Sequence, residues 1–213
     1  MRILILANGS EPSVELLGSL REKCDRFIAA DGGGNTALKL GFRPDTVIGD
    51  LDSFRPDGDL NGKFDGQIIR DSDQETNDLE KALSHARSLK AVRVDVLGAT
   101  GKRLDHTLKN LSVLQQFDPF FEAMAFYDDF FYTRILPREF AIRLPPGHLV
   151  SLFPLSGSAG GIVTDGLRYP LSNESLENGR RDGSSNETVS GPVRIRHTSG
   201  CLLFMTALTP DLL

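Results

Sequence analysis

The first part of the chain alternates short apolar runs with amphipathic segments. The apolar runs predict buried strands at 2–7, 27–30, 47–49, 67–70, 92–97 and 123–127. In the segments between them, apolar residues recur three or four positions apart, as in Val14, Leu17 and Leu20, and this spacing predicts helices. Repeated alternation of strand and helix predicts a mostly parallel sheet with right-handed crossovers, the α/β class.

The pattern changes from about Leu136, where no helical period continues and Pro, Gly and Ser separate short apolar runs. These runs predict strands at 140–144, 149–153, 161–164, 193–196 and 201–205. Several short strands joined by turns are typical of a small β-sandwich. The polar, Gly-rich stretch 178–187 is expected to be a surface loop. We therefore predict an α/β domain at 1–135 and a β-sandwich domain at 136–213.

Composition narrows the class of protein. The chain has 213 residues, of which 39% are hydrophobic and 25% charged, as in ordinary globular proteins. A net charge of -5 argues against a nucleic-acid or anionic-membrane binder that depends on its overall field. The apolar start, 1–7, is too short for a signal peptide or a membrane span. Cys24 and Cys201 lie far apart without metal-ligand spacing, so we expect reduced thiols and a cytoplasmic protein.

Acidic residues follow several of the predicted parallel strands. Asp31 follows one strand, Asp50 and Asp52 follow the next, and Asp78 opens the helix after the fourth. In such sheets, ligands bind beyond the carboxyl ends of the strands. Two carboxylates separated by one residue can converge on Mg²⁺, which prefers oxygen ligands. The sequence therefore predicts a divalent-cation site at this edge.

Each of these segments also has a local structural explanation. Asp, Gly and Ser favour turns, Asn77 and Glu80 have the spacing of a helix capping pair, and an acid in the first helical turn is stabilised by the helix dipole. The metal hypothesis rests on their joint occurrence, because solvated turns have no reason to share one edge of a sheet.

The Gly-rich turn 98–106 offers cations to the same edge. It carries Lys102 and Arg103, which could hold a polyphosphate, Arg through paired hydrogen bonds and Lys as a point charge. The turn is not a P-loop, since the required spacing and the Lys-Ser/Thr pair are missing.

Taken in order, these motifs resemble those of the thiamin pyrophosphokinase family. The matching stretches are 31–33, 49–53, Gln74 with 78–82, 98–106, 166–171 and 185–187. Each motif is short, but the ordered set is specific and spans nearly the whole chain. The resemblance implies transfer of a diphosphoryl group from ATP to thiamin, giving thiamin diphosphate and AMP. It also implies an α/β nucleotide-binding domain, a β-sandwich that binds thiamin, and a homodimer whose sites are shared between subunits.

The resemblance also implies roles for individual residues. It makes Asp50, Asp52 and Asp78 the ligands of Mg²⁺, with Asp52 or Asp78 as the acceptor of the hydroxyl proton. Gln74 lies in the motif near the reacting groups. The remaining matches are nucleotide-binding and thiamin-binding positions: Asp31, Gly32, Arg103, Asp105, Ser185 and Asn186.

The chain departs from the family pattern in two places. Asn77 stands where the family commonly has Thr, and we expect shifted substrate contacts with activity retained, because Asn also caps helices and forms hydrogen bonds. The chain has no Trp, although some family members stack thiamin on an aromatic side chain. Tyr169 and Phe204 are candidates for that role, but both are expected to pack inside the sandwich.

Two other functions are compatible with these residues. One is a diphosphokinase acting on another small alcohol, such as a pterin with a hydroxymethyl group. The other is a nucleotide-binding sensor without turnover, which would not need a full set of metal-binding acids.

Overall fold

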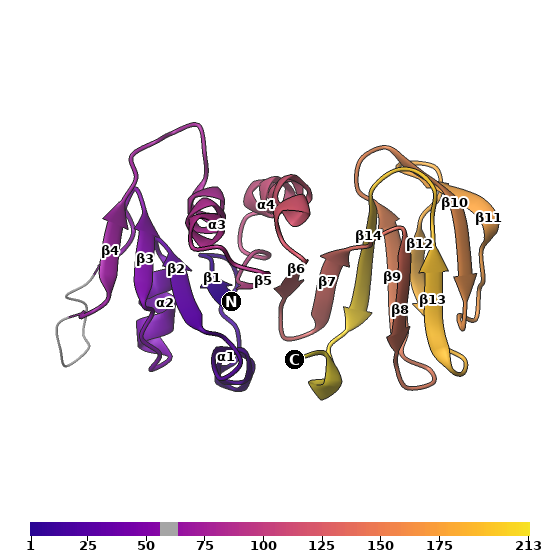
Figure 1. Ribbon diagram of the computed structural model, residues 1–213, viewed down its shortest axis with the longest axis horizontal. Coiled ribbons are helices and arrows are strands. Elements are labelled where there is room, and N and C mark those ends of the chain that lie inside the picture. The colour runs from indigo at the N-terminus through magenta and orange to yellow at the C-terminus, as the bar shows by residue number, and fades with distance from the viewer. Residues whose placement is uncertain (56–63) are drawn as a thin grey trace. The chain divides into compact units, whose positions relative to one another are not determined.

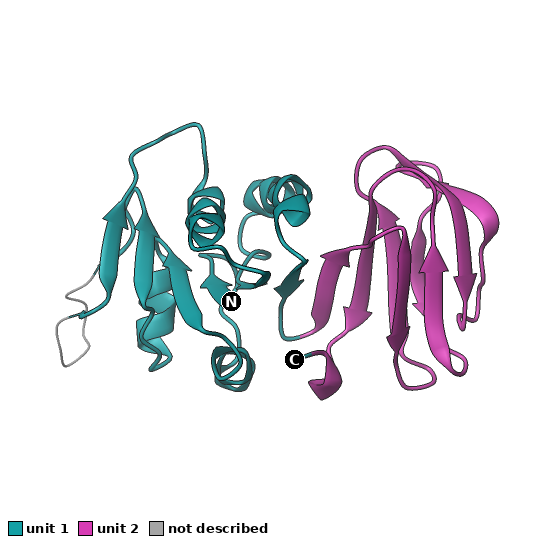
Figure 2. Ribbon diagram, viewed as in Figure 1, with its two compact units in different colours: residues 1–129, 213 teal, residues 130–212 magenta. Residues whose placement is uncertain are grey.

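The computed structural model describes residues 1–55 and 64–213, which form two compact units, 1–129 with Leu213 and 130–212 (Figure 2). The first unit ends between Asp129 and Phe130, a few residues before the boundary expected near residue 135. The difference arises because Phe131–Ile135 is a strand that pairs with Leu202–Ala207 of the second unit. In the described residues, no helix combines the length and apolar character needed to cross a membrane.

The first unit is an α/β unit, and its predicted class is confirmed. Its sheet has the strand order β6-β5-β1-β2-β3-β4, and every adjacent pair is parallel (Figure 1). The strands are β1 (Arg2–Leu6), β2 (Arg26–Ala30), β3 (Thr46–Gly49), β4 (Gln67–Arg70), β5 (Arg93–Leu97) and β6 (Ala123–Tyr127). The helices are α1 (Val14–Arg21), α2 (Gly33–Lys39), α3 (Asp78–Ser88) and α4 (Leu104–Phe117), followed by the short η1 (Asp118–Phe120).

The connections between these strands reverse direction once. The chain runs outward from β1 to β4 and then returns through α3 to β5, on the other side of β1. Right-handed crossovers therefore place α1 and α2 on one face of the sheet and α3 and α4 on the other. The reversal lies between β1 and β5, and ligands of such sheets bind beside a reversal of this kind.

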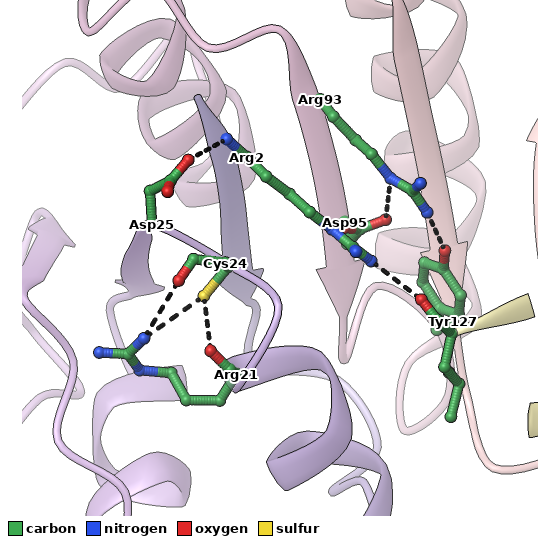
Figure 3. Close-up of polar contacts among 8 residues, drawn as sticks. Arg2, Arg21, Cys24, Asp25, Arg93, Asp95 and Tyr127 are labelled. Atoms are coloured by element: carbon green, nitrogen blue, oxygen red, sulfur yellow. Dashed lines mark hydrogen bonds and ion pairs between the residues drawn. The ribbon is translucent and has the colours of Figure 1, made fainter.

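A group of charges around the buried Asp95 lies at the centre of this sheet (Figure 3). Asp95 of β5 is 2% exposed, and its carboxylate accepts hydrogen bonds from Arg2 Nε at 2.5 Å and Arg93 Nε at 3.3 Å. Arg93 Nη2 also donates to the hydroxyl of buried Tyr127 at 3.1 Å. These side chains join the neighbouring strands β1, β5 and β6. The buried Asp95 carboxylate is paired with two guanidinium groups.

The second unit has two antiparallel sheets, in agreement with the predicted β-sandwich (Figure 2). One has the order β12-β9-β14-β7 and the other β11-β10-β13-β8. Their strands are β7 (Phe131–Ile135), β8 (Glu139–Arg143), β9 (Leu149–Pro154), β10 (Ser158–Asp165), β11 (Ser172–Glu177), β12 (Gly183–Glu187), β13 (Pro192–Arg196) and β14 (Leu202–Ala207), and η2 (Pro210–Leu212) follows. The rings of Phe140 on β8 and Phe204 on β14 lie 5.3 Å apart and join the two sheets.

The five strands predicted in this unit are confirmed, but the loop predicted at 178–187 is wrong in its second half. Residues 183–187 form β12, which pairs with β9. This strand is an edge strand of polar residues whose pairing uses backbone groups, so the apolar pattern gave no signal for it.

Candidate active site

A cavity of about 480 Å³ lies at the carboxyl ends of the parallel strands in the first unit. The predicted site residues that line it are Asp31, Asp50, Asp52, Asp78 and Arg103. They come from the segments after β2, after β3, at the start of α3 and before α4. The prediction that these acids lie near one another is confirmed.

Three of the carboxylates form a tight group, which we call the acid cluster: Asp31, Asp50 and Asp78. One oxygen of each lies within 4.8 Å of the others. Asp31 is 3% exposed, and its Oδ1 accepts the Phe54 amide at 3.1 Å. Burial raises the pKa of Asp78, and the nearby Asp31 carboxylate raises it further. An acid cluster with this much repulsion favours an added cation.

Asp52 lines the cavity but is not a member of the acid cluster. Leu51, between Asp50 and Asp52, has a φ of 63°, an unusual backbone conformation for leucine. In this turn the Asp52 amide donates to Asp50 Oδ1 at 3.1 Å, while Asp52 Oδ1 accepts the Ser53 hydroxyl at 2.7 Å. The two acids of the motif therefore have different surroundings, one among carboxylates and one beside a hydroxyl.

Gly49 is the residue that lets two acids approach each other. A Cβ at this position would lie 2.9 Å from Asp31 Cβ and 3.0 Å from Asp78 Oδ1. The φ of Gly49 is 159°, at the edge of the range that side chains rarely adopt. The backbone at the end of β3 thus leaves room for carboxylates that any other residue would displace.

Asn77 holds the start of α3, which carries Asp78. The predicted capping pair is confirmed: Asn77 Oδ1 accepts the Glu80 amide, and Glu80 Oε2 accepts the Asn77 amide, both at 2.9 Å. Asn77 Nδ2 also donates to Asn110 Oδ1 at 2.9 Å, and Asn110 in turn donates to the Ala99 carbonyl at 2.7 Å. These bonds connect α3, α4 and the Gly-rich turn.

The cavity wall beyond β1 and β5 carries the cations. Lys102 Nζ lies 3.2 Å from the Asn8 carbonyl oxygen, and both residues line the cavity. The Arg103 guanidinium is paired with Asp105 at 2.5 Å, and this hydrogen bond lowers the pKa of Asp105 to about 2. Because both side chains are exposed, Arg103 can exchange this partner for a phosphate.

Three predicted residues of the first unit do not line this cavity: Gly32, Gln74 and Asp105. Gln74 is exposed, and its Nε2 donates to the Ser72 carbonyl at 3.3 Å. Gly32 is packed against the Asn8 side chain, which would lie 2.4 Å from an added Cβ. Asp105 reaches the cavity through its partner Arg103.

Ser185 and Asn186 lie on β12 of the second unit and differ in accessibility. Ser185 is exposed, with a φ of 59°. Asn186 is 9% exposed, and its side chain accepts the Tyr169 amide at 3.1 Å and donates to the Tyr169 carbonyl at 2.8 Å. Asn186 therefore fixes the backbone of Tyr169.

The two candidate aromatic residues behave differently. Phe204 is fully buried, as expected. Tyr169 is 62% exposed, so the expectation that it packs inside the sandwich is wrong. Asn186 holds the backbone amide and carbonyl of Tyr169, and the ring lies outside the core.

Sequence reasoning missed three contributions to the site. It assigned Asp31 to the nucleotide and did not count it among the ligands of the metal. It gave no role to Lys81, whose ammonium is buried 3.6 Å from Asp78 Oδ1. It also overlooked Asn110, although a polar residue in the apolar stripe Val113, Leu114 and Phe117 of α4 is a usable signal.

Comparison with known proteins adds independent information. A family model described as "Thiamin pyrophosphokinase, catalytic domain" matches residues 17–126, and one described as "Thiamin pyrophosphokinase, vitamin B1 binding domain" matches residues 135–202. The chain is 29% identical over 199 residues to "Thiamine pyrophosphokinase 1" of Oryza sativa subsp. japonica, covering 81% of this chain and 75% of the rice protein.

Solved structures show the same fold. The thiamin pyrophosphokinase from Geobacillus thermodenitrificans is 25% identical, is covered over 100% of both chains and superposes with a TM-score of 0.82. The Bacillus subtilis thiamine pyrophosphokinase is 22% identical, covers 97% of this chain and 99% of its own, and has a TM-score of 0.80. The comparisons do not favour a pterin diphosphokinase or a sensor. The two models of this family match one unit each, so this chain belongs to the thiamin pyrophosphokinase family.

Proposed function

We propose that this thiamin pyrophosphokinase transfers a diphosphoryl group from ATP to the hydroxyethyl group of thiamin, giving thiamin diphosphate and AMP. The observation that carries the proposal is the acid cluster facing Lys102 and Arg103 across one cavity. Acids that attract a divalent cation and cations that attract phosphates are the two requirements of phosphoryl transfer.

The cation assigned to this cavity is Mg²⁺, held by Asp50, Asp52 and Asp78, with Asp31 as a further carboxylate. All the ligand atoms are carboxylate oxygens, which Mg²⁺ prefers. Gly49 leaves room beside Asp31 and Asp78 that a side chain would fill. When bound, Mg²⁺ supplies positive charge to the phosphate oxygens of the nucleotide.

The chain's own residues account for the remaining requirements. The hydroxyl oxygen of thiamin forms a bond to the β-phosphorus of ATP, and the bond from that phosphorus to the oxygen shared with the α-phosphate breaks, so that AMP leaves. Lys102 and Arg103 donate hydrogen bonds to the phosphates, where charge develops. Asp52 or Asp78 accepts the hydroxyl proton.

The other assigned residues position the substrates. Asp31, Gly32 and Asp105 surround the nucleotide, Asp105 by holding Arg103 until phosphate replaces it. Gln74 lies near the reacting groups. In the β-sandwich, Ser185 contacts thiamin, and Asn186 acts by presenting Tyr169, whose exposed ring can stack on an aromatic cation.

The protein is further proposed to be a cytoplasmic homodimer with sites shared between subunits. In the described part of the chain, neither Cys24 nor Cys201 is in a disulfide, which suits a reducing compartment. No nucleic acid or membrane is assigned as a partner, in keeping with the net charge of -5.

The direct test is release of AMP from MgATP in the presence of thiamin or of a hydroxymethyl pterin. AMP should be released with thiamin and not with the pterin. Asp52→Asn should fold normally and lose turnover about a hundredfold or more, because a charge at the reacting phosphates is removed. A magnesium-dependent rate near that of the wild type would contradict the role of Asp52.

The shared site is tested by mixing two damaged proteins, Asp78→Ala and Asn186→Ala, under conditions where subunits exchange. Each alone should be nearly inactive. In a mixed dimer one site carries both lesions and the other neither, so random pairing should restore roughly a quarter of wild-type activity. No recovery, with exchange verified by mass spectrometry, would contradict shared sites and leave the chemistry untouched.

A further inference from the structure

Lys81 is a buried cation beside the acid cluster. Its side chain is 3% exposed and lies on α3, one turn beyond Asp78. The ammonium nitrogen is 3.6 Å from Asp78 Oδ1, longer than a hydrogen bond. Within the described residues, Asp78 is its ion-pair partner, and exposed Asp73 also feels its charge.

A second lysine near the same helix shows what an ordinary pair looks like. Lys109 Nζ lies 2.9 Å from Glu80 Oε2, and the Lys109 side chain is 45% exposed. Its charge is hydrated as well as paired. The Lys81 ammonium is buried and its ion pair with Asp78 is longer, and burying an ammonium group is costly unless nearby charge compensates for it. A single contact at 3.6 Å is weak compensation, whereas three carboxylates together are strong.

We propose that Lys81 is the resident counter-cation of the acid cluster. It neutralises part of the negative charge of Asp31, Asp50 and Asp78 when no divalent ion is bound, and its charge lowers the affinity of the cluster for a free divalent ion. The inference rests on the proposed metal site and assigns Lys81 a positioning role. It acts on the cluster through the field it creates and does not touch substrate.

Weak binding of the free ion has a use in this chemistry. Mg²⁺ is commonly held by one or two carboxylates together with the phosphates of a nucleotide. A site that holds the free ion weakly fills mainly when phosphates complete it. Lys81 thereby couples occupancy of the acid cluster to arrival of MgATP.

The test compares Lys81→Met with the charge-preserving Lys81→Arg and the control Lys109→Met. Magnesium binding is measured by calorimetry without nucleotide, and thermal unfolding is followed in EDTA and in millimolar Mg²⁺. Lys81→Met should unfold at a lower temperature in EDTA and bind Mg²⁺ about tenfold more tightly, since a positive charge near the ion is removed. Lys81→Arg and Lys109→Met should bind Mg²⁺ as the wild type does.

Two results would overturn the proposal. Unchanged or weaker Mg²⁺ binding by Lys81→Met would show that Lys81 does not oppose the ion. An equal drop in unfolding temperature in EDTA and in Mg²⁺ would show that Lys81 acts by packing alone.

A second variant guards against a failure to fold. Asp50→Asn should raise the unfolding temperature of Lys81→Met in EDTA more than that of the wild type, because it removes one of the unbalanced charges. If Lys81→Met and the double variant are both unfolded in EDTA and in Mg²⁺, charge balance is the wrong explanation. If neither the wild type nor Lys81→Met binds Mg²⁺, the proposed metal site fails, and the comparison in EDTA still decides the role of Lys81.

Discussion

Two groups of charges in the first unit, each around a buried carboxylate, have opposite ratios of acidic to basic side chains. Around Asp95, one carboxylate is paired with two guanidinium groups, from Arg2 and Arg93 (Figure 3). In the acid cluster, three carboxylates lie within 4.8 Å of one another, beside the one ammonium of Lys81. Charges that serve the fold are neutralised by the chain itself. Charges left in excess indicate a ligand that must bring the missing charge.

The largest effect is expected from Asp50→Asn, which removes one charge of the acid cluster. Turnover should fall about a thousandfold, or roughly 4 kcal/mol of transition-state stabilisation, because a metal ligand is lost. The free energy of unfolding in EDTA should not decrease, since repulsion is relieved and the amide oxygen can still accept the Asp52 amide. Steady-state kinetics and urea unfolding measure the two quantities. A clear loss of stability would mean that the cluster serves the fold after all.

Asp95→Asn tests the balanced group. Leaving two guanidinium groups without their carboxylate should lower the free energy of unfolding by about 3 kcal/mol. The rate per folded molecule should not change, because Asp95 lies away from the cavity. Urea unfolding gives the stability, and kinetics at a temperature where the variant is folded give the rate. A large loss of turnover with unchanged stability would erase the distinction between the two groups.

Gly49→Ala tests how closely the acids are placed. The added methyl group would lie 2.9 Å from Asp31 Cβ and 3.0 Å from Asp78 Oδ1, so the carboxylates must move apart. We expect a loss of about 2 kcal/mol in stability from overpacking and a weaker affinity for Mg²⁺. Gly147→Ala is a matched control, because its added Cβ would meet no atom within 4 Å, although its φ of 73° also strains the backbone. Unchanged Mg²⁺ binding by Gly49→Ala would show that the spacing of the acids is not critical.

Asn77→Thr should have the smallest effect. Threonine can cap α3 but cannot also donate to Asn110, so about 1 kcal/mol of stability should be lost. The enzyme should remain active, since Asp78 keeps its place in the first turn of the helix. Complete inactivity of a folded variant would show that the site depends on the amide of Asn77.

The two units also differ in how far their sequence predicts their structure. In the first unit, the strands other than β4 are largely buried, and the alternating pattern predicts its six strands and four α-helices. The pattern gave no signal for η1, and β4 is mostly exposed where a buried strand was expected. In the second unit, three strands escape the prediction: β11 and β12, which are polar edge strands, and β7, which lies just before the expected domain boundary. A strand such as Ser172–Glu177 buries one apolar side chain, Leu176, and depends on partners that the sequence does not reveal.

The site shows the same limit. The position of Asp31 after a strand predicts that it lies at the edge of the sheet, but not that it meets Asp50 and Asp78. That meeting depends on the turn at Leu51 and on the space beside Gly49. Lys81 reads as one more charged residue in a helix, and its burial follows from how α3 packs on β2 and β3. The residue types predicted a cation site, whereas the packing of the elements determined which side chains lie beside one another.

The hydrogen bonds of Asn186 bear on the entropy of ligand binding. Both the amide and the carbonyl of Tyr169 are already held by this one side chain, which also accepts the Glu187 amide. Ordering the backbone of a mobile loop costs about 1 kcal/mol or more per residue. Folding has already ordered this backbone, so a ligand that stacks on Tyr169 restricts only the rotation of the ring at this residue. The conformational entropy lost on binding is correspondingly small.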